Sequence, residues 1–153
     1  MVYGGICMKS ELDKLIFDMA EDDSVLYDAS RDFTTLNAWK KARRVKLFCY
    51  RCVLPLLPKE EIYGLGSHSR KASVSTTANI AEGYGRFHYQ EGIQFYRIAR
   101  GSLYELKDHL ISCFDFAYIN EELLKEGLEL VEDAKKTLNG YIGFVKKQKR
   151  INS

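Results

Sequence analysis

Residues 96–117 read YRIARGSLYELKDHLISCFDFA and carry the clearest regular pattern in the sequence. Apolar side chains recur there at alternating intervals of three and four residues, which places them along one face of an α-helix. A stripe that continues through three heptads is typical of a helix packed lengthwise against other helices. The pattern therefore predicts a long bundle helix, which the segment 115–119 closes. Its apolar face comprises Tyr96, Ala99, Leu103, Leu106, Leu110, Cys113 and Ala117.

The segment after this helix predicts another. Asn120 is placed to accept a backbone N–H as an N-cap, and Glu121 and Glu122 favour the positive end of the helix dipole. Basic residues at 146–150 complement the negative end of the same dipole. The expected apolar face comprises Leu124, Leu128, Val131, Leu138, Ile142 and Val145.

A first core helix is expected well before these two. Thr34 or Thr35 is placed to act as its N-cap, and the helix should end just before Pro55, because the residue before a proline avoids the α region. The apolar residues between these limits again alternate in steps of four and three. They are Ala38, Ala42, Val45, Cys49 and Cys52.

A second helix is expected between the first and the long one, with Gly66 or Ser67 as its cap. Residues 72–83 are mainly Ala, Ser, Thr and Gly, and such small side chains let another helix approach closely. The two glycines at 83 and 85 are not enough to form a phosphate-cradling loop, and no strand precedes them as it would precede such a loop. They are interpreted as the end of this helix, since glycine adopts the positive φ of a helix terminus.

These helices together predict an all-α fold, an antiparallel up-down-up-down four-helix bundle over residues 33–149 with a tail at 150–153. The chain of 153 residues suits one domain, and no run alternates as a strand does. Residues 1–32 form an extension with little regular pattern, apart from a candidate helix at 11–21.

The charges are divided unevenly along the chain. The extension has three basic and eight acidic residues, whereas residues 33–153 have 20 basic and 13 acidic residues. A basic body favours anionic partners. No apolar run is long enough to span a bilayer and no secretory signal precedes the body, so a cytoplasmic location without membrane contact is predicted. The four cysteines suit a reducing compartment as buried apolar side chains.

Several motifs resemble one known family. The sequence SRKASVSTTANIAEGYGR at 69–86 and the sequence GSLYEL at 101–106 resemble the signature of the ribosomal-RNA intervening-sequence proteins. Segments 33–42 and 58–65 match that family's first helix and first connection. The similarity covers residues 33–145. One departure is that the family usually has proline where Ser75 or Thr76 stands, so a kink expected in the second helix is absent.

The resemblance implies an antiparallel four-helix bundle that assembles as a ring, usually a homopentamer, with no enzymatic activity and no cofactor. Some members are encoded inside insertions in large-subunit ribosomal RNA genes. Related proteins are accessory variability determinants of diversity-generating retroelements, and these bind nucleic acid and a reverse transcriptase. The same partners are therefore candidates here.

A cluster of cations on the first helix is the leading candidate binding site. Such side chains neutralise phosphates without reading sequence, and a ring would repeat the patch in every subunit. The alternative is that they form ordinary solvated surface. The candidate nucleic-acid-binding residues are Lys40, Lys41, Arg43, Arg44, Lys46 and Arg51.

A second candidate is a polar set on the second and third helices. Its two carboxylates admit acid–base catalysis or a metal site, but an interhelical hydrogen-bond network that fixes register is the preferred interpretation. No histidine follows a glutamate by three, as a di-iron bundle would require. The members are Asn79, Glu82, Arg86, Ser102 and Glu105.

The cysteines offer two further alternatives. Zinc usually takes four ligands, and the pair Cys49 and Cys52 has no second pair to complete them. Cys113 and His109 have the helical spacing of a catalytic pair, although Cys113 also belongs to the apolar stripe. We therefore interpret the cysteines as core residues.

Aromatic residues near the start of the third helix exceed what one thin bundle easily buries. Because aromatic side chains are enriched in interfaces, this cluster is predicted to form the oligomer interface. Its members are Tyr84, Phe87, Tyr89 and Phe95, with Tyr96 beside them.

The sequence thus predicts a non-enzymatic homo-oligomeric scaffold that binds RNA or DNA through its basic face, in the role of an accessory to a reverse transcriptase. The alternative is a protein–protein interaction module with no affinity for nucleic acid. The acidic extension is expected to cover the basic face in the free protein.

Overall fold

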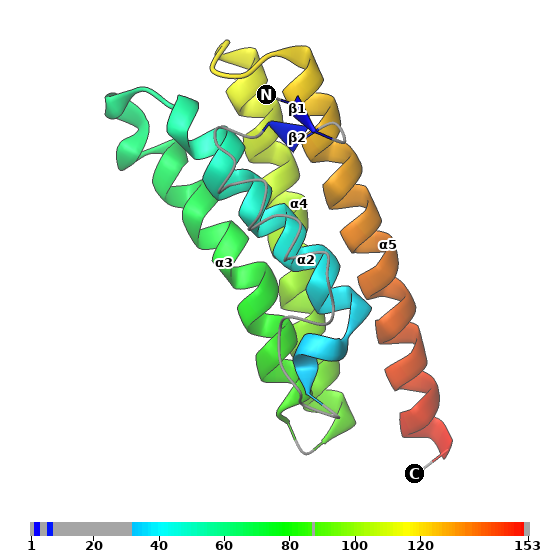
Figure 1. The fold of residues 1–153 in the computed structure, drawn as a ribbon. Coiled ribbons are helices and arrows are strands. Elements are labelled where there is room, and N and C mark those ends of the chain that lie inside the picture. Colours follow the sequence, from blue (N-terminus) through cyan, green and yellow to red (C-terminus); the bar gives the residue numbers. More distant parts are fainter. Residues whose placement is uncertain (1, 4–5, 8–31, 87, 152–153) are drawn as a thin grey trace.

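The structure is a computed structural model that describes residues 2–3, 6–7, 32–86 and 88–151. Four α-helices dominate it: α2 (Asn37–Phe48), α3 (Leu65–Tyr84), α4 (Tyr89–Asp115) and α5 (Glu121–Ile151). Successive helices run in opposite directions along one long axis (Figure 1). The predicted antiparallel four-helix bundle is therefore confirmed.

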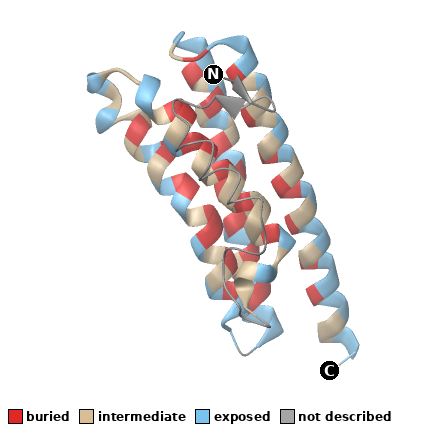
Figure 2. Cartoon of the chain, viewed as in Figure 1, coloured by how far each residue is buried: buried red, intermediate tan, exposed pale blue. Residues whose placement is uncertain are grey.

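Each helix packs against two neighbours, so that the four axes form the corners of a square. α2 contacts α3 and α5, and α4 contacts the same two helices from the other side. The buried residues of Figure 2 line the inner face of each helix. All of the apolar face predicted for α4 is buried except Ala117, and the whole stripe predicted for α2 is buried. The core therefore follows the heptad pattern of the sequence.

The start of α2 differs from the prediction. Asp32 is the residue that caps, and its carboxylate accepts a 2.7 Å hydrogen bond from Phe33 N. A 3₁₀ turn, η1 (Phe33–Thr35), follows, and Leu36 precedes α2 without a side-chain cap. Thr35 donates its hydroxyl to Asp32 O instead of accepting a backbone N–H. A carboxylate two residues before the first expected cap thus caps the 3₁₀ turn, and neither threonine caps α2.

The end of α2 widens before the proline. A π-helical turn, η2 (Cys49–Val53), continues α2, and a 3₁₀ turn, η3 (Leu54–Leu56), carries Pro55. Proline has no N–H to continue an α-helical ladder, so the change of helix type lies where the sequence predicts an end. Cys49 and Cys52 both stay buried through the wider turn.

α3 begins earlier than predicted. A 3₁₀ turn, η4 (Lys59–Ile62), leads to Gly64, which precedes the first helical residue. The carboxylate of Glu61 accepts a 2.8 Å hydrogen bond from Leu65 N and so satisfies a free N–H of the first turn. Gly66, one of the two predicted caps, is buried inside the helix.

Two glycines bring α3 and α4 into close contact. A Cβ atom at Gly83 would lie 2.6 Å from Tyr96 Cε1, and one at Gly92 would lie 2.8 Å from the carbonyl oxygen of Gly83. Gly83 is therefore a packing residue inside α3, not the helix end that the sequence predicts. The helix ends one residue later, at Tyr84. Gly85 is the cap residue, as the sequence predicts, but it has an ordinary negative φ in place of the expected positive one.

The connection between α4 and α5 is tight. Ala117 has a φ of 59°, the left-handed conformation that more often falls to glycine, and is exposed instead of completing the apolar stripe. Tyr118 N donates to Cys113 O across this turn at 2.8 Å. Asn120 then caps α5, because its side-chain oxygen accepts from Leu123 N at 2.9 Å. The predicted cap is confirmed.

The apolar face of α5 is rotated at its N-terminal end relative to the prediction. Leu123 and Gly127 are buried there, whereas Leu124 and Leu128 are only half-buried. A Cβ atom at Gly127 would meet the ring of Phe48 at 2.8 Å. The remaining predicted positions, from Val131 onward, are buried.

A short ribbon lies in the N-terminal extension, where no strand is predicted. β1 (Val2–Tyr3) pairs antiparallel with β2 (Ile6–Cys7), and β2 contacts α5 and η2. Strands of two residues are too short to show an alternating pattern. The candidate helix at 11–21 and the predicted covering of the basic face lie outside the described residues.

Replacing Gly83 with alanine is expected to destabilise the bundle by roughly 1–3 kcal/mol, because the new methyl group overlaps the Tyr96 ring in a packed contact. Gly143→Ala is the matched control. No atom outside its own helix lies near a Cβ there, so the gain in helix propensity should stabilise by about 1 kcal/mol. Chemical denaturation of both variants measures the difference. Equal stabilisation by the two alanines would contradict the close contact.

Candidate nucleic-acid-binding surfaces

The six cations of the first predicted site lie on α2 and on η2. From residue 33 to residue 58 the chain has these six basic residues and no carboxylate. The structure leaves all six half-buried. They are Lys40, Lys41, Arg43, Arg44, Lys46 and Arg51.

Several of these cations have partners within the chain. Lys41 Nζ lies 2.6 Å from a carboxylate oxygen of Asp133 on α5, and Lys46 Nζ donates to Thr77 Oγ1 on α3 at 3.1 Å. The guanidinium of Arg43 lies 5.9 Å from the centre of the Trp39 ring. The aliphatic parts of these side chains therefore also pack α2 against both neighbouring helices.

Burial and mutual repulsion both act on this cluster. Burial lowers the pKa of Arg43, and the positive charge of Arg51 lowers it further. Burial also lowers the pKa of Lys46, with a smaller contribution from Arg43. The charged forms are thus disfavoured mainly by burial and secondarily by the positive potential of the neighbouring arginines. An added anion would offset that potential.

A second concentration of cations lies at the end of the bundle where α4 begins and α5 ends. A groove of about 460 Å³ separates the two helices there. Its wall contains four basic residues and no carboxylate. The lining residues are Gln90, Ile93, Arg97, Lys146, Lys149 and Arg150. The sequence pattern indicates a role for the three basic residues on α5 only as complements of the helix dipole.

An aromatic cavity lies at the same end, between α4, α5 and the last turn of α3. Its volume is about 330 Å³. Tyr96 and Tyr141 pack edge to face with ring centres 5.1 Å apart, and the Tyr141 and Phe144 rings lie nearly parallel at 6.3 Å. Tyr84 and Tyr89 complete its aromatic lining. Arg86, His88 and Gln148 supply polar groups at the same cavity.

The sequence pattern of the 23S rRNA-intervening sequence proteins matches residues 34–140, which include α2, α3, α4 and most of α5. The chain belongs to this family. No curated protein matches it. Within the described segments, no helix has the combination of length and apolar character that crossing a membrane requires.

The predicted aromatic interface of this 23S rRNA-intervening sequence protein divides into separate environments. Tyr84 and Tyr89 lie at the cavity, whereas Phe95 packs beneath the guanidinium of Arg86, 4.6 Å from its ring centre. Tyr96 is buried within the chain, so it is not surplus apolar surface as the sequence suggests. Phe87 lies outside the described residues.

Other exposed apolar side chains of this family member, which were not predicted, follow the outer face of α4. Tyr104, Ile111 and Phe114 are 54, 38 and 39% exposed. A shallow groove of about 480 Å³ runs nearby, where Leu124 and Leu128 of α5 stand among charged residues of both signs. These residues lie on a flank of the bundle. The spacing of seven residues between Tyr104 and Ile111 is the sequence signal that places them on one face of α4.

The predicted polar network separates into three groups in this 23S rRNA-intervening sequence protein. Asn79 Nδ2 donates to Ser75 Oγ at 2.9 Å, and Ser102 Oγ lies in hydrogen-bond contact with the same hydroxyl at 2.8 Å. Glu82, in the last turn of α3, instead pairs with Arg86, which lies just after the helix, and both side chains are exposed. Glu105 lies on α4 beside His109, 3.9 Å from Nε2. Of these three groups, the first forms a hydrogen bond between two helices, because Ser75 reaches α4 where both backbones carry small side chains.

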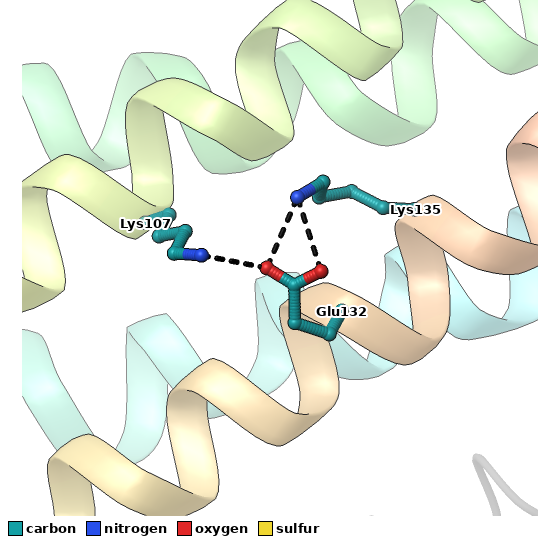
Figure 3. A network of polar contacts seen from close by, with 3 residues as sticks. All are labelled: Lys107, Glu132 and Lys135. Atoms are coloured by element: carbon teal, nitrogen blue, oxygen red, sulfur yellow. Dashed lines mark hydrogen bonds and ion pairs between the residues drawn. The ribbon is translucent and has the colours of Figure 1, made fainter.

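A polar cluster that was not predicted joins α4 to α5. Glu132 accepts from Lys107 Nζ at 2.8 Å and from Lys135 Nζ at 3.0 and 3.1 Å (Figure 3). Lys135 Nζ also lies 3.8 Å from the centre of the Tyr104 ring. Burial alone would lower the pKa of Lys135, but its bonds to Glu132 and Tyr104 raise it. The buried ammonium is thus fully compensated, which fixes the two helices side by side.

The thiols of Cys49 and Cys113 do not have the character of nucleophiles or metal ligands in this structure. Burial raises the pKa of Cys49 to about 12 and that of Cys113 to about 11. His109 also has its pKa lowered by burial, although Glu105 and Asp108 act in the opposite sense. In the described part of the chain, no three residues of the metal-binding types gather as a cation site would need.

Glu126 on α5 should make the stability of the bundle depend on pH. Burial raises the pKa of its carboxyl from 4.5 to about 7, and the charge of Glu129 adds to the rise. The folded carboxyl therefore binds a proton more tightly than the unfolded one. Stability should fall as the pH rises from about 4.5 to about 7 and stay at the lower value above that range.

Thermal unfolding of Glu126→Gln should show a weaker decline over that pH range and a higher Tm than the parent protein above it. Glu129→Gln is the matched control, since it removes only the smaller of the two causes and leaves the buried carboxyl in place. A decline of equal size in the parent and in Glu126→Gln would show that other groups control the pH dependence.

Proposed function

We propose that this protein is a non-enzymatic, self-associating scaffold that binds RNA or DNA electrostatically in the cytoplasm and presents it to a processing partner. A reverse transcriptase is the partner that the family resemblance favours. The observation that carries the proposal is the stretch from residue 33 to 58, whose six charged side chains are all basic and all lie on α2 and η2.

The electrostatics of α2 support binding to a polyanion. Arg43 and Lys46 both have lowered pKa values, first because of burial and second because other arginines stand close. A phosphate backbone brings negative charge at regular intervals and would relieve this repulsion. Long flexible basic side chains also suit contacts to phosphates, which position a nucleic acid without reading its bases.

Affinity for a structured RNA should fall steeply with salt and should depend on α2. Replacing Lys40, Lys41, Arg43 and Arg44 with glutamine removes four potential phosphate contacts. The slope of log affinity against log salt concentration should then become shallower by about 3. Fluorescence anisotropy across a salt series measures both the affinity and the slope.

The control variant replaces Lys59, Lys125, Lys136 and Lys147, which are exposed and lie outside α2 and η2, with glutamine. It loses the same net charge and should keep most of the slope. Equal losses in the two variants would show that binding depends on net charge alone, and an unchanged slope in the α2 variant would refute this assignment of the surface.

Self-association is the second part of the proposal. The flank formed by Tyr104, Ile111 and Phe114, with the groove at Leu124 and Leu128, exposes apolar surface beside charges of both signs. Interfaces combine such an apolar centre with a polar rim. A head-to-tail contact that uses this flank would close into a ring. The ring would then present the α2 cations once for each subunit.

Light scattering coupled to size exclusion should give a mass several times that of one chain. Ile111→Glu combined with Leu128→Glu should reduce the mass to that of a monomer, because two carboxylates would be buried in the interface without partners. Ile62→Glu combined with Val74→Glu, at exposed positions on other elements, is the matched control. A monomeric parent protein would refute the scaffold.

The alternative function is a protein–protein interaction module, and one contact favours it. Lys41 already forms an ion pair with Asp133, so part of the α2 charge is neutralised inside the chain. A module of this type would bind a partner protein and show no affinity for nucleic acid even at low salt. The anisotropy series above separates the two functions.

A further inference from the structure

We propose that the end of the bundle formed by α3, α4 and α5 is a second site, which binds an unpaired nucleotide of a single strand. The base would occupy the aromatic cavity, and the neighbouring phosphates would follow the basic groove. The inference rests on the proposed affinity for nucleic acid. It adds a second binding site and a preference for single strands, neither of which the α2 surface supplies.

The cavity has the size and walls that a nucleobase needs. Its volume of about 330 Å³ falls at the lower end of the range of small-molecule sites. Three of its rings retain surface for a ligand, since Tyr84, Tyr89 and Phe144 are 37, 44 and 56% exposed. Bases stack on such rings whatever their identity, because each base has a π-face.

The deeper wall of the cavity is fixed by the helix packing. Tyr96 is buried against Gly83, where any side chain larger than hydrogen would overlap its ring. Burial raises the pKa of Tyr96, and a hydrogen bond to Tyr141 adds to the rise, so both phenols stay neutral. A neutral, preformed aromatic wall reduces the ordering that a bound base would otherwise require.

The basic groove lies beside the cavity along the same two helices. On α4, the cavity is lined by Tyr89, Gly92 and Tyr96. The residue directly after each of these lines the groove, namely Gln90, Ile93 and Arg97. On α5, Val145 and Gln148 line the cavity, and Lys146 and Lys149 line the groove. The two sites therefore flank one helix pair at one level, at the end of the bundle that is marked C in Figure 1.

The charges at this end select an anion that carries aromatic rings. Neither the cavity nor the groove has a carboxylate in its lining. Arg97, Lys146 and Arg150 contribute positive charge to the groove, and Lys149 is held there by its 2.8 Å hydrogen bond to Gln90. A single strand offers both parts of the required chemistry, whereas a duplex keeps its bases stacked on one another and offers only phosphates.

The test compares two fluorescent oligonucleotides of equal length, one with bases and one abasic, binding to the full chain at fixed salt. The parent protein should bind the base-bearing strand about tenfold more tightly, given the contribution of one stacked base. Phe144→Ala combined with Tyr89→Ala should abolish this preference and leave the affinity for the abasic strand unchanged.

The control is Phe116→Ala combined with Tyr63→Ala. These are again one phenylalanine and one tyrosine, they are 59 and 90% exposed, and neither lines the cavity. This variant should keep the preference for bases. Circular dichroism of both double variants confirms that each is folded, since all four side chains are exposed at the surface.

Arg97→Gln combined with Lys146→Gln tests the groove. Removing two phosphate contacts to a single strand should make the salt slope shallower by about 1.4, and Lys125→Gln combined with Lys136→Gln should leave the slope unchanged. Equal effects of these two variants would overturn the assignment of the groove.

Failure of this inference differs from failure of the proposed function. Equal affinity of the parent protein for the abasic and base-bearing strands would overturn the nucleotide site while keeping electrostatic binding through α2. An absence of binding to either strand and to duplex RNA at low salt would overturn both. A mass that falls in the Phe144 and Tyr89 variant would assign the cavity to subunit contact instead of a base.

Discussion

The close contact between α3 and α4 is the constraint on which the rest of the structure depends. It is possible only because side chains are nearly absent at Gly83 and Gly92, whose backbones approach within the space that a methyl group would fill. Farther along the same pair, Ser75 and Ser102 bridge the helices with a 2.8 Å contact between hydroxyls. The hydroxyls of Ser73, Thr76 and Thr77 donate to carbonyls of their own helix, so these three buried groups have hydrogen-bond partners.

The same contact prepares the aromatic end of the bundle. Because α3 presents no side chain at Gly83, the ring of Tyr96 fits against its backbone and supports Tyr141 on α5. The polar cluster of Lys107, Glu132 and Lys135 then holds α5 against α4 farther from that end. α5 is therefore fixed in a position from which its last turns carry Phe144 on one side and Lys146 on the other. The packing of α3, α4 and α5 therefore also determines which side chains reach the surface at this end of the bundle.

The basic residues of the chain serve two purposes that the sequence does not distinguish. On α2, Lys41 and Lys46 bond to the neighbouring helices, and Arg43 packs on Trp39, so these cations contribute to the bundle as well as to its potential. At the far end of α5, Lys146 and Arg150 line an open groove. A cation near a helix C-terminus also interacts favourably with the helix dipole. The sequence pattern alone therefore does not distinguish that role from a role in lining a groove.

The sequence by itself determined the four helices of the bundle, their direction and most of their buried faces, because heptad spacing and short connections leave few other ways to bury the apolar stripes. It also identified Asn120 as a cap, since that signal is local. The tertiary structure alone decided that Gly83 is a contact and not a helix end, that a 3₁₀ turn capped by Asp32 precedes α2 in place of a threonine cap, and that Asn79 and Glu82 belong to different groups. It also brought residues 84, 96, 141 and 144 together around one cavity. Such features depend on which residues of distant segments meet, and a periodic pattern specifies a face of a helix without specifying what lies opposite it.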